Sequence, residues 1–198
     1  LPANFRRAGL IGDGASADAL PAVAGAAAVL SGSCSPATLA QLAHARERVP
    51  VFQIDPLADG APLAAEALRW AGARLGAAPV VFAATAPPDA VAAVQRRLGR
   101  ERAGVLVEGV MAEIARGLVA AGVRRLVVAG GETAGAVVQA LGVTGLRIGR
   151  QIDPGVPWTV SLPRSPAEPV LALALKSGNF GAPDFFLRAF AAFEEATA

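Results

Sequence analysis

Residues 124–135 read RRLVVAGGETAG, and this stretch decides the fold class. The apolar, β-branched run LVVA is typical of a strand, and it stops at a glycine pair. The residues that follow, AVVQAL, have the periodicity of an amphipathic helix. A strand, a glycine turn and a helix in direct succession form one unit of a parallel sheet wrapped by helices, so the stretch predicts an α/β domain.

The same alternation of short apolar runs and Ala-rich amphipathic stretches continues on both sides. It predicts a three-layer, mostly parallel Rossmann-like sheet with helices on both faces and some antiparallel C-terminal strands. We expect strands at residues 26–31, 50–54, 79–84, 124–129, 145–149, 158–162 and 169–175. We expect helices at residues 36–48, 61–76, 87–99, 103–121, 133–141 and 183–196. Residues 1–24, with a turn at Asp13-Gly14, are expected to form a connecting arm, and residues 25–198 a domain.

Composition restricts the class of protein. Of the 198 residues, 54% are hydrophobic and only 17% charged, which suits a folded domain and excludes a disordered chain. The net charge of +2 is too small, and the arginines are too scattered, for a nucleic-acid-binding protein. Because the longest apolar run near the start is too short to span a bilayer, we expect a soluble, cytoplasmic protein with no membrane partner.

Cysteine and histidine are too rare to build a metal centre. The chain has one cysteine, Cys34, and one histidine, His44, so it can form neither an internal disulfide nor a zinc ligand set from these residues. We therefore predict no zinc site and assign no metal-ligating residue, and we expect Cys34 to be a small buried residue. The chain begins with Leu1 instead of methionine, so we expect it to be part of a longer protein.

Small polar residues follow three of the expected strands. Residues 32–35 (GSCS) follow the first strand, residues 130–135 (GGETAG) the fourth and residues 176–181 (KSGNFG) the last. In open α/β sheets the carboxyl ends of the strands form the binding crevice, so the three junctions should line one site. Two of them lead into a helix N-terminus, which favours an anion, and Ser35 is placed as an N-cap before Pro36. The alternative for each junction is a glycine kept for the turn alone.

Lys176 is the single lysine of a chain that has 17 arginines. A compact ammonium group on a flexible stem suits a phosphate, which makes Lys176 a candidate for neutralising phosphate charge. The alternative is a surface lysine at a strand end. Neither GxxxxGK[ST] nor GxGxxG occurs, so a nucleotide would be bound by a less common set of loops.

Four blocks, taken together and in order, resemble the four-carbon acid sugar kinases. They are SGSCSPAT at 31–38, GGETAG at 130–135, IGRQIDPGVPW at 148–158 and LALKSGNFG at 173–181. Members of that family phosphorylate acids such as threonate, erythronate and 3-oxo-tetronate. The resemblance covers residues 25–198 and corresponds to the family's C-terminal, nucleotide-binding half.

The resemblance implies ATP as ligand, with Mg²⁺ bridging its phosphate oxygens. Around the phosphates and ribose it points to Ser33 or Ser35, to Gly130, Gly131, Glu132 and Thr133, and to Gly178 and Gly181. Lys176, because of its charge, and Ser177 and Asn179, in the same glycine-rich turn, complete the cofactor site that we expect. Glu132 has two interpretations, a helix cap or a contact with magnesium through water. Ala134 departs from the family pattern, where we expect serine in many members.

The resemblance also implies that the site is shared with another domain. The family's N-terminal half carries the sugar-acid site and the catalytic base, so the catalytic residues stay unknown and this chain alone should not turn over substrate. We expect its own N-terminal domain as a partner, and Ala-rich helix faces would also allow a homodimer. Two other functions stay open: a non-catalytic anion-binding or regulatory module, and an NAD-dependent oxidoreductase domain, which the missing GxGxxG disfavours.

Overall fold

A seven-stranded sheet with the strand order β2-β3-β1-β4-β7-β6-β5 forms the centre of the molecule. The structure, a computed structural model, describes residues 7–8, 18–58, 60–76 and 78–197. The strands are β1 (Ala26–Ser31), β2 (Val51–Gln53), β3 (Val80–Ala83), β4 (Val123–Ala129), β5 (Leu146–Asp153), β6 (Val156–Ser161) and β7 (Ala172–Lys176). The first five strands in this order, β2, β3, β1, β4 and β7, run parallel to one another, whereas β6 is antiparallel to both β7 and β5.

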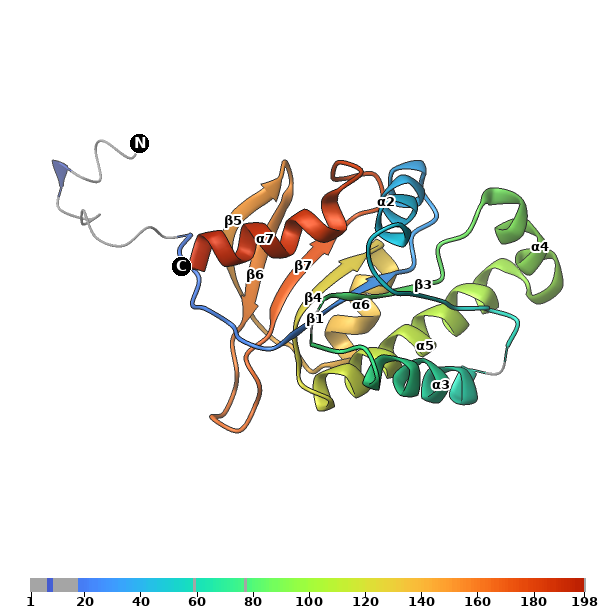
Figure 1. Cartoon of the computed structure of the whole chain (residues 1–198), viewed down its shortest axis with the longest axis horizontal. Coiled ribbons are helices and arrows are strands. Elements are labelled where there is room, and N and C mark those ends of the chain that lie inside the picture. The colour runs from blue at the N-terminus through green and yellow to red at the C-terminus, as the bar shows by residue number, and fades with distance from the viewer. Residues whose placement is uncertain (1–6, 9–17, 59, 77, 198) are drawn as a thin grey trace.

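Helices cover both faces of the sheet and give three layers (Figure 1). One face carries α3 (Gly60–Gly72), α5 (Arg100–Ala120) and α6 (Gly131–Ala140). The other face carries α2 (Pro36–Arg46) and α7 (Phe185–Thr197). The remaining helix, α4 (Pro88–Leu98), packs against α5 and has no buried residue. No helix in the described ranges is long and apolar enough to cross a membrane.

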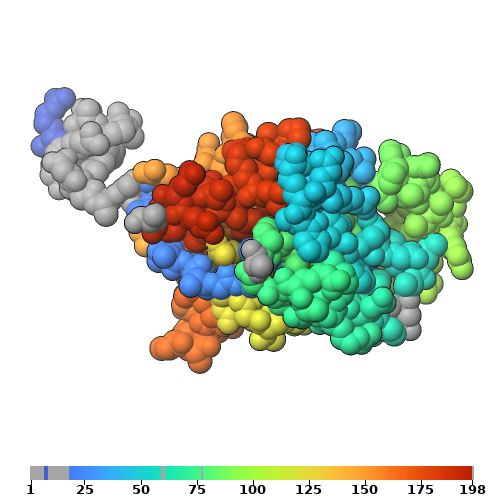
Figure 2. All heavy atoms as spheres, in the orientation of Figure 1, coloured from blue at the N-terminus to red at the C-terminus, as the bar shows by residue number. Residues whose placement is uncertain are grey.

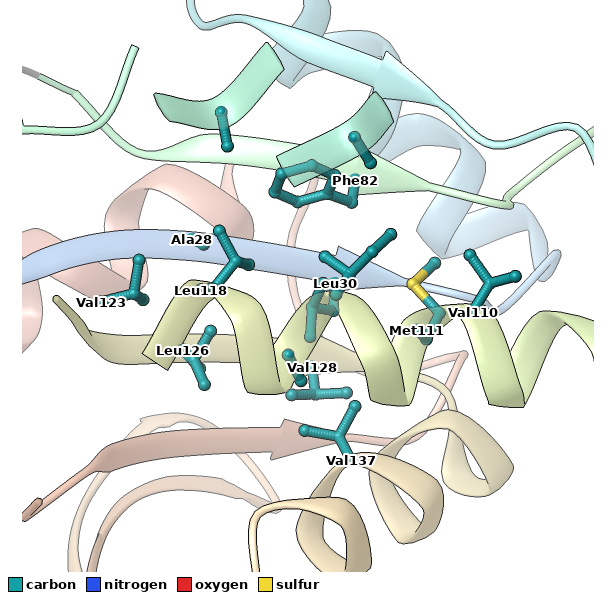
Figure 3. Close-up of a cluster of buried hydrophobic side chains, with 14 of the residues drawn as sticks. Ala28, Leu30, Phe82, Val110, Met111, Leu118, Val123, Leu126, Val128 and Val137 are labelled. Carbon is teal, nitrogen blue, oxygen red and sulfur yellow. The ribbon is translucent and has the colours of Figure 1, made fainter. Parts of the chain in front are cut away.

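The central strands are apolar throughout because both of their faces are buried. Along β4, Leu126 and Val128 contribute to the core under α5 and α6, while Val127 contributes to the core under α2 and α7. In Figure 3 the first of these cores joins the sheet to Met111 and Leu118 of α5. The side chains of the run LVVA therefore pack alternately against the helical layers on the two faces of the sheet.

The fold class expected from the sequence is confirmed, and the elements begin and end close to their expected residues. The main difference is β5, which continues to Asp153 instead of ending at residue 149. It pairs with β6 through a two-residue turn in which Gly155 has a φ of +81°. Residues 154–155 thus form the turn of a β-hairpin, because Gly155 supplies the left-handed conformation that this turn requires.

Residues 18–24 cross the sheet face beside β5 before the chain enters β1. Leu20 packs directly over Gly149, and Asp18 pairs with Arg150 at 3.5 Å. This segment contains neither helix nor strand, and the division of the chain into an arm (residues 1–24) and a domain (residues 25–198) stays a prediction. The expected turn at Asp13-Gly14 lies outside the described residues.

Candidate functional site

A crevice opens at the carboxyl edge of the sheet, between β1 and β4. These strands are parallel neighbours, with Ser31 opposite Ala129 at their carboxyl ends. The chain leaves β1 into α2 on one face of the sheet and leaves β4 into α6 on the other face. Connections that diverge in this way open a crevice outside the carboxyl ends of the strands, where open α/β sheets bind their ligands.

Two glycine-containing turns meet at the base of this crevice. The backbone N–H groups of Gly32 and Ser33 both donate to the carbonyl of Ala129, at 3.0 Å. A side chain on Gly32 would overlap the hydroxyl of Thr133, and Gly130 has a φ of +125°. Close packing therefore requires glycine at position 32, and backbone conformation requires it at position 130.

The N-terminus of α6 points its free donors at the crevice. Gly130 is the N-cap, and no side chain caps the helix. The first N–H groups of a helix have no partner within it, and in α6 they belong to Gly131, Glu132 and Thr133, which all line the cavity. Free N–H groups and the helix dipole together favour an anion at this position.

The cavity outside these turns has a volume of about 1130 Å³. Its base consists of residues 32–34, residues 130–133 and Gly178. Its outer walls come from the loops after β2 and β3, from α4 and from the first half of α5. In Figure 2 a notch separates the α2 segment (blue) from α4 (light green). The cavity combines an amide-rich base with a wall of helices.

The outer walls are largely apolar. Val91 and Val94 of α4, Val107 of α5 and Ile54 after β2 line them. Apolar walls with a few polar groups are typical of small-molecule sites, and they suit the flat ring of a nucleotide base.

Acidic side chains outnumber basic ones around the cavity. Asp55, Glu101, Glu108 and Glu132 line it, together with Arg100. Side-chain charge therefore cannot balance a polyphosphate there. Backbone N–H groups, the α6 dipole and a cation held by carboxylates would have to do so. The described residues contain no cluster of three or more histidine, cysteine or acidic side chains that could hold a metal by itself.

The structure divides the eleven site residues expected from the sequence into two groups. Six line the cavity: Ser33, Gly130, Gly131, Glu132, Thr133 and Gly178. Five lie beside or beneath it: Ser35, Lys176, Ser177, Asn179 and Gly181. The single cysteine, which we expected to be buried, is half-buried and lines the cavity.

Ser35 caps α2, as its position before Pro36 predicts. Its Oγ accepts a hydrogen bond from the N–H of Thr38 at 3.2 Å. The same oxygen lies 2.6 Å from the carbonyl of Gly178 and donates to it. The hydroxyl thus joins α2 to the loop after β7 and does not face the cavity.

Lys176 is buried beneath the loop after β7 and is only 1% exposed. Its Nζ donates to Thr38 Oγ1 at 3.1 Å and to the carbonyls of Ser177 and Gly178 at 3.2 and 3.1 Å. Burial lowers the pKa of this amine to about 8. The single lysine is therefore not the surface residue of the alternative interpretation, and its ammonium does not line the cavity where a phosphate would contact it.

The loop of residues 177–182 is fastened on two sides. On one side, Gln41 Nε2 of α2 donates to the carbonyls of residues 180–182 at 2.9–3.1 Å. On the other, Asp153 at the end of β5 accepts from the N–H of Ala182 at 3.0 Å and pairs with Arg188. Burial raises the pKa of Asp153, but these hydrogen bonds outweigh it and hold that pKa below its usual value. The end of β5 is thus joined to the loop that follows β7.

Sequence reasoning missed more than half of the cavity wall. The loops at residues 53–56 and 84–86 lie at the same carboxyl edge as the glycine turns. Because each loop follows the end of an expected strand, the sequence could have indicated that these residues belong to the site. No local sequence pattern indicates that α4 and α5 contribute to the cavity wall, because their cavity residues resemble those of any amphipathic helix. Only the packing of α4 on α5 directs them to the site.

A crevice of this kind on this fold is typical of nucleotide-binding domains, and the comparison with protein families agrees. The model of the nucleotide-binding C-terminal domain matches residues 28–186, and the chain belongs to that family. Its resemblance to the four-carbon acid sugar kinases is confirmed by relatives that carry the name 3-oxo-tetronate kinase. The Burkholderia multivorans enzyme is 55% identical over 198 residues, which are 99% of this chain and 45% of the relative. The Cupriavidus necator enzyme is 56% identical over 189 residues, covering 94% of this chain and 42% of the relative.

The chain thus spans a little under half the length of the curated relatives it matches. Solved structures show the same relation. A Haemophilus influenzae protein is 38% identical with a TM-score of 0.80, and the match covers 95% of this chain and 44% of that one. A Bordetella bronchiseptica protein of unknown function, solved with citrate as a domain-swapped dimer, is 25% identical with a TM-score of 0.68 and covers 87% of this chain and 42% of its own.

Proposed function

We propose that this chain is the ATP-binding domain of a kinase that phosphorylates four-carbon sugar acids, of the 3-oxo-tetronate, threonate or erythronate type. The observation that carries the proposal is the crevice between β1 and β4, where the uncapped N-terminus of α6 follows its own glycine turn and packs tightly against the glycine turn after β1. The names of the relatives support a sugar-acid kinase as the activity of the longer protein.

The base of the crevice fits a polyphosphate. The N–H groups of residues 131–133 would bind phosphate oxygens, and the hydroxyl of Ser33 lies within the same wall. Gly178 lets the loop after β7 pack against the turn after β1, because a side chain there would overlap Ser33 Oγ. The glycines of the base would also let the backbone approach a phosphate closely. The apolar wall of α4 and α5 would hold the adenine ring.

The carboxylates of the cavity fit Mg²⁺, because hard cations prefer oxygen ligands and usually keep several waters. Glu132, in the first turn of α6, and Asp55, after β2, are the candidates to hold it, directly or through water. When bound, the cation would neutralise charge on the phosphate oxygens during phosphoryl transfer.

The acceptor site and the catalytic base are proposed to lie in an N-terminal domain, as the length of the relatives suggests. In phosphoryl transfer the protein mainly positions the reacting groups and stabilises charge, so the two domains would have to close on each other. We also propose a cytoplasmic location, in agreement with the single cysteine, and a homodimer, for which the domain-swapped relative is a precedent.

Isothermal titration calorimetry on the 198-residue chain tests the donor site directly. We expect heat of binding for ATP with Mg²⁺, weaker binding for AMP and none for NAD, with circular dichroism to verify that the domain is folded. A folded domain that binds no adenine nucleotide at millimolar concentration would refute the proposal. Binding of NAD in preference to ATP would favour the oxidoreductase alternative. If the longer protein binds ATP but consumes none with any four-carbon sugar acid, the chain is a regulatory module instead.

A further inference from the structure

Lys176 lies one hydrogen bond behind the crevice wall. Its Nζ donates to the carbonyl of Gly178 at 3.1 Å, and Gly178 lines the cavity. Two hydroxyls at the start of α2 approach the same carbonyl, with Oγ of the N-cap Ser35 at 2.6 Å and Thr38 Oγ1 at 2.9 Å. Three donors thus converge on one carbonyl oxygen and hold it on the α2 side of the loop.

This arrangement fixes the direction of the neighbouring N–H group. The carbonyl of Gly178 and the N–H of Asn179 belong to one trans peptide, so they point in opposite directions. The N–H therefore points away from α2, and no acceptor among the described residues binds it. If the peptide were turned over, a carbonyl oxygen would take its place, and that oxygen would repel a phosphate.

The ammonium of Lys176 has no opposite charge beside it. Its neighbours are the hydroxyl of Thr38 on α2, the carbonyls of Ser177 and Gly178, and the ring of Phe186 on α7 at 6.0 Å. None of these groups titrates, and no carboxylate in the described part of the chain lies within ion-pair distance of Nζ. A buried cation without a counter-ion costs free energy, and an anion in the crevice would supply the missing charge.

We propose that Lys176 is a positioning residue of the nucleotide site, which acts on the phosphates from behind the wall without touching them. It holds the Gly178–Asn179 peptide with its N–H free for a phosphate oxygen, and it adds one positive charge where the cavity side chains are mostly acidic. This inference rests on the proposed binding of a nucleotide.

The test is calorimetric titration with ATP and with adenosine at pH values from 7 to about 9.5. Lys176→Met should weaken ATP binding about tenfold or more, since a charge-assisted hydrogen bond and a nearby charge are lost, and adenosine binding much less. ATP affinity of the parent protein should fall as the pH rises through about 8, while that of Lys176→Met should stay level. Arg147→Met, which removes an exposed charge on β5, is the matched control and should behave as the parent.

A direct phosphate contact makes a different prediction. An amine-reactive reagent should leave the buried Lys176 unmodified with or without ATP, whereas a lysine that contacts phosphate would react and be protected by ATP. Equal losses for ATP and adenosine, or a level pH profile in the parent protein, would overturn the inference. A parent protein that binds no nucleotide would instead overturn the proposed function. If Lys176→Met fails to fold, the pH profile of the parent protein still decides.

Discussion

Removing the charge of Lys176 should change how the stability of the fold depends on pH. The side chain is 1% exposed and has no carboxylate partner among the described residues, so folding takes a charged amine out of water with only neutral oxygens to replace it. Burial lowers its pKa from 10.5 to about 8. Lys176→Met keeps an unbranched side chain in the same space without the charge.

The size and sign of the effect follow from that pKa difference. Between pH 8 and 10.5 the unfolded chain binds more protons at this site than the folded chain does, so the free energy of unfolding rises with pH across this window. At about 1.4 kcal/mol per pKa unit, the rise amounts to about 3 kcal/mol. Below pH 8 the penalty of the buried charge is fully present, and Lys176→Met should not show the rise.

Urea denaturation of both proteins at pH values from 7 to about 10.5 measures the effect, because urea leaves electrostatic interactions unscreened. The chain is favourable for this experiment, since it contains no tyrosine and no other lysine. Cys34→Ser in both proteins removes the one thiol. Stabilities of parent and variant that run parallel over this range would show that the amine is not desolvated in the folded state, and the reasoning would be wrong.

Three further changes test other parts of the site. Gly32→Ala should weaken ATP binding at least tenfold, because the new methyl group pushes Thr133 and the N-terminus of α6 away. The control Gly135→Ala, whose new Cβ meets nothing within 4 Å, should bind ATP normally and be up to about 1 kcal/mol more stable. Equal ATP affinities of the two variants, measured by calorimetry, would contradict the role of close packing. Iodoacetamide should alkylate Cys34 at the cavity wall, and saturating ATP with Mg²⁺ should slow the reaction measured by mass spectrometry; an unchanged rate would place the nucleotide elsewhere. Asp153→Asn should cost about 1 kcal/mol at pH 7, allowing for the solvent around Arg188, and the difference from the parent should shrink as the pH falls through the lowered pKa of Asp153. A difference that does not depend on pH would exclude the ion pair as its cause.

The glycine turns show how far the sequence could lead to the site. The GSCS and GGETAG blocks are local signals, because a strand, a small-residue turn and a helix start follow one another directly in the chain. Parallel strands place such turns at one edge of the sheet, so the approach of residues 32–33 to residues 130–133 could be expected. The residues expected from these turns line the cavity, apart from Ser35, whose hydroxyl is committed to Thr38 and Gly178.

The loop after β7 shows where sequence reasoning was incomplete. Lys176 stood out as the single lysine beside glycine, and its chemistry suggested a phosphate ligand. Its burial depends on Ser35 and Thr38, about 140 residues away in the chain, which close over the loop from α2. No local pattern in KSGNFG records that approach, so the direction in which the ammonium points could not be predicted.

The sequence by itself therefore determined the α/β class, the order of most elements, the glycine turns at the crevice and the family, because these depend on local periodicity and on short contiguous blocks. Only the tertiary structure decided which of the small and polar residues face the cavity, that α4 and α5 complete its wall, and that Lys176 lies behind the wall. The physical reason is that these features depend on contacts between α2, the loop after β7 and the α4–α5 pair, which are close in space but far apart in the chain.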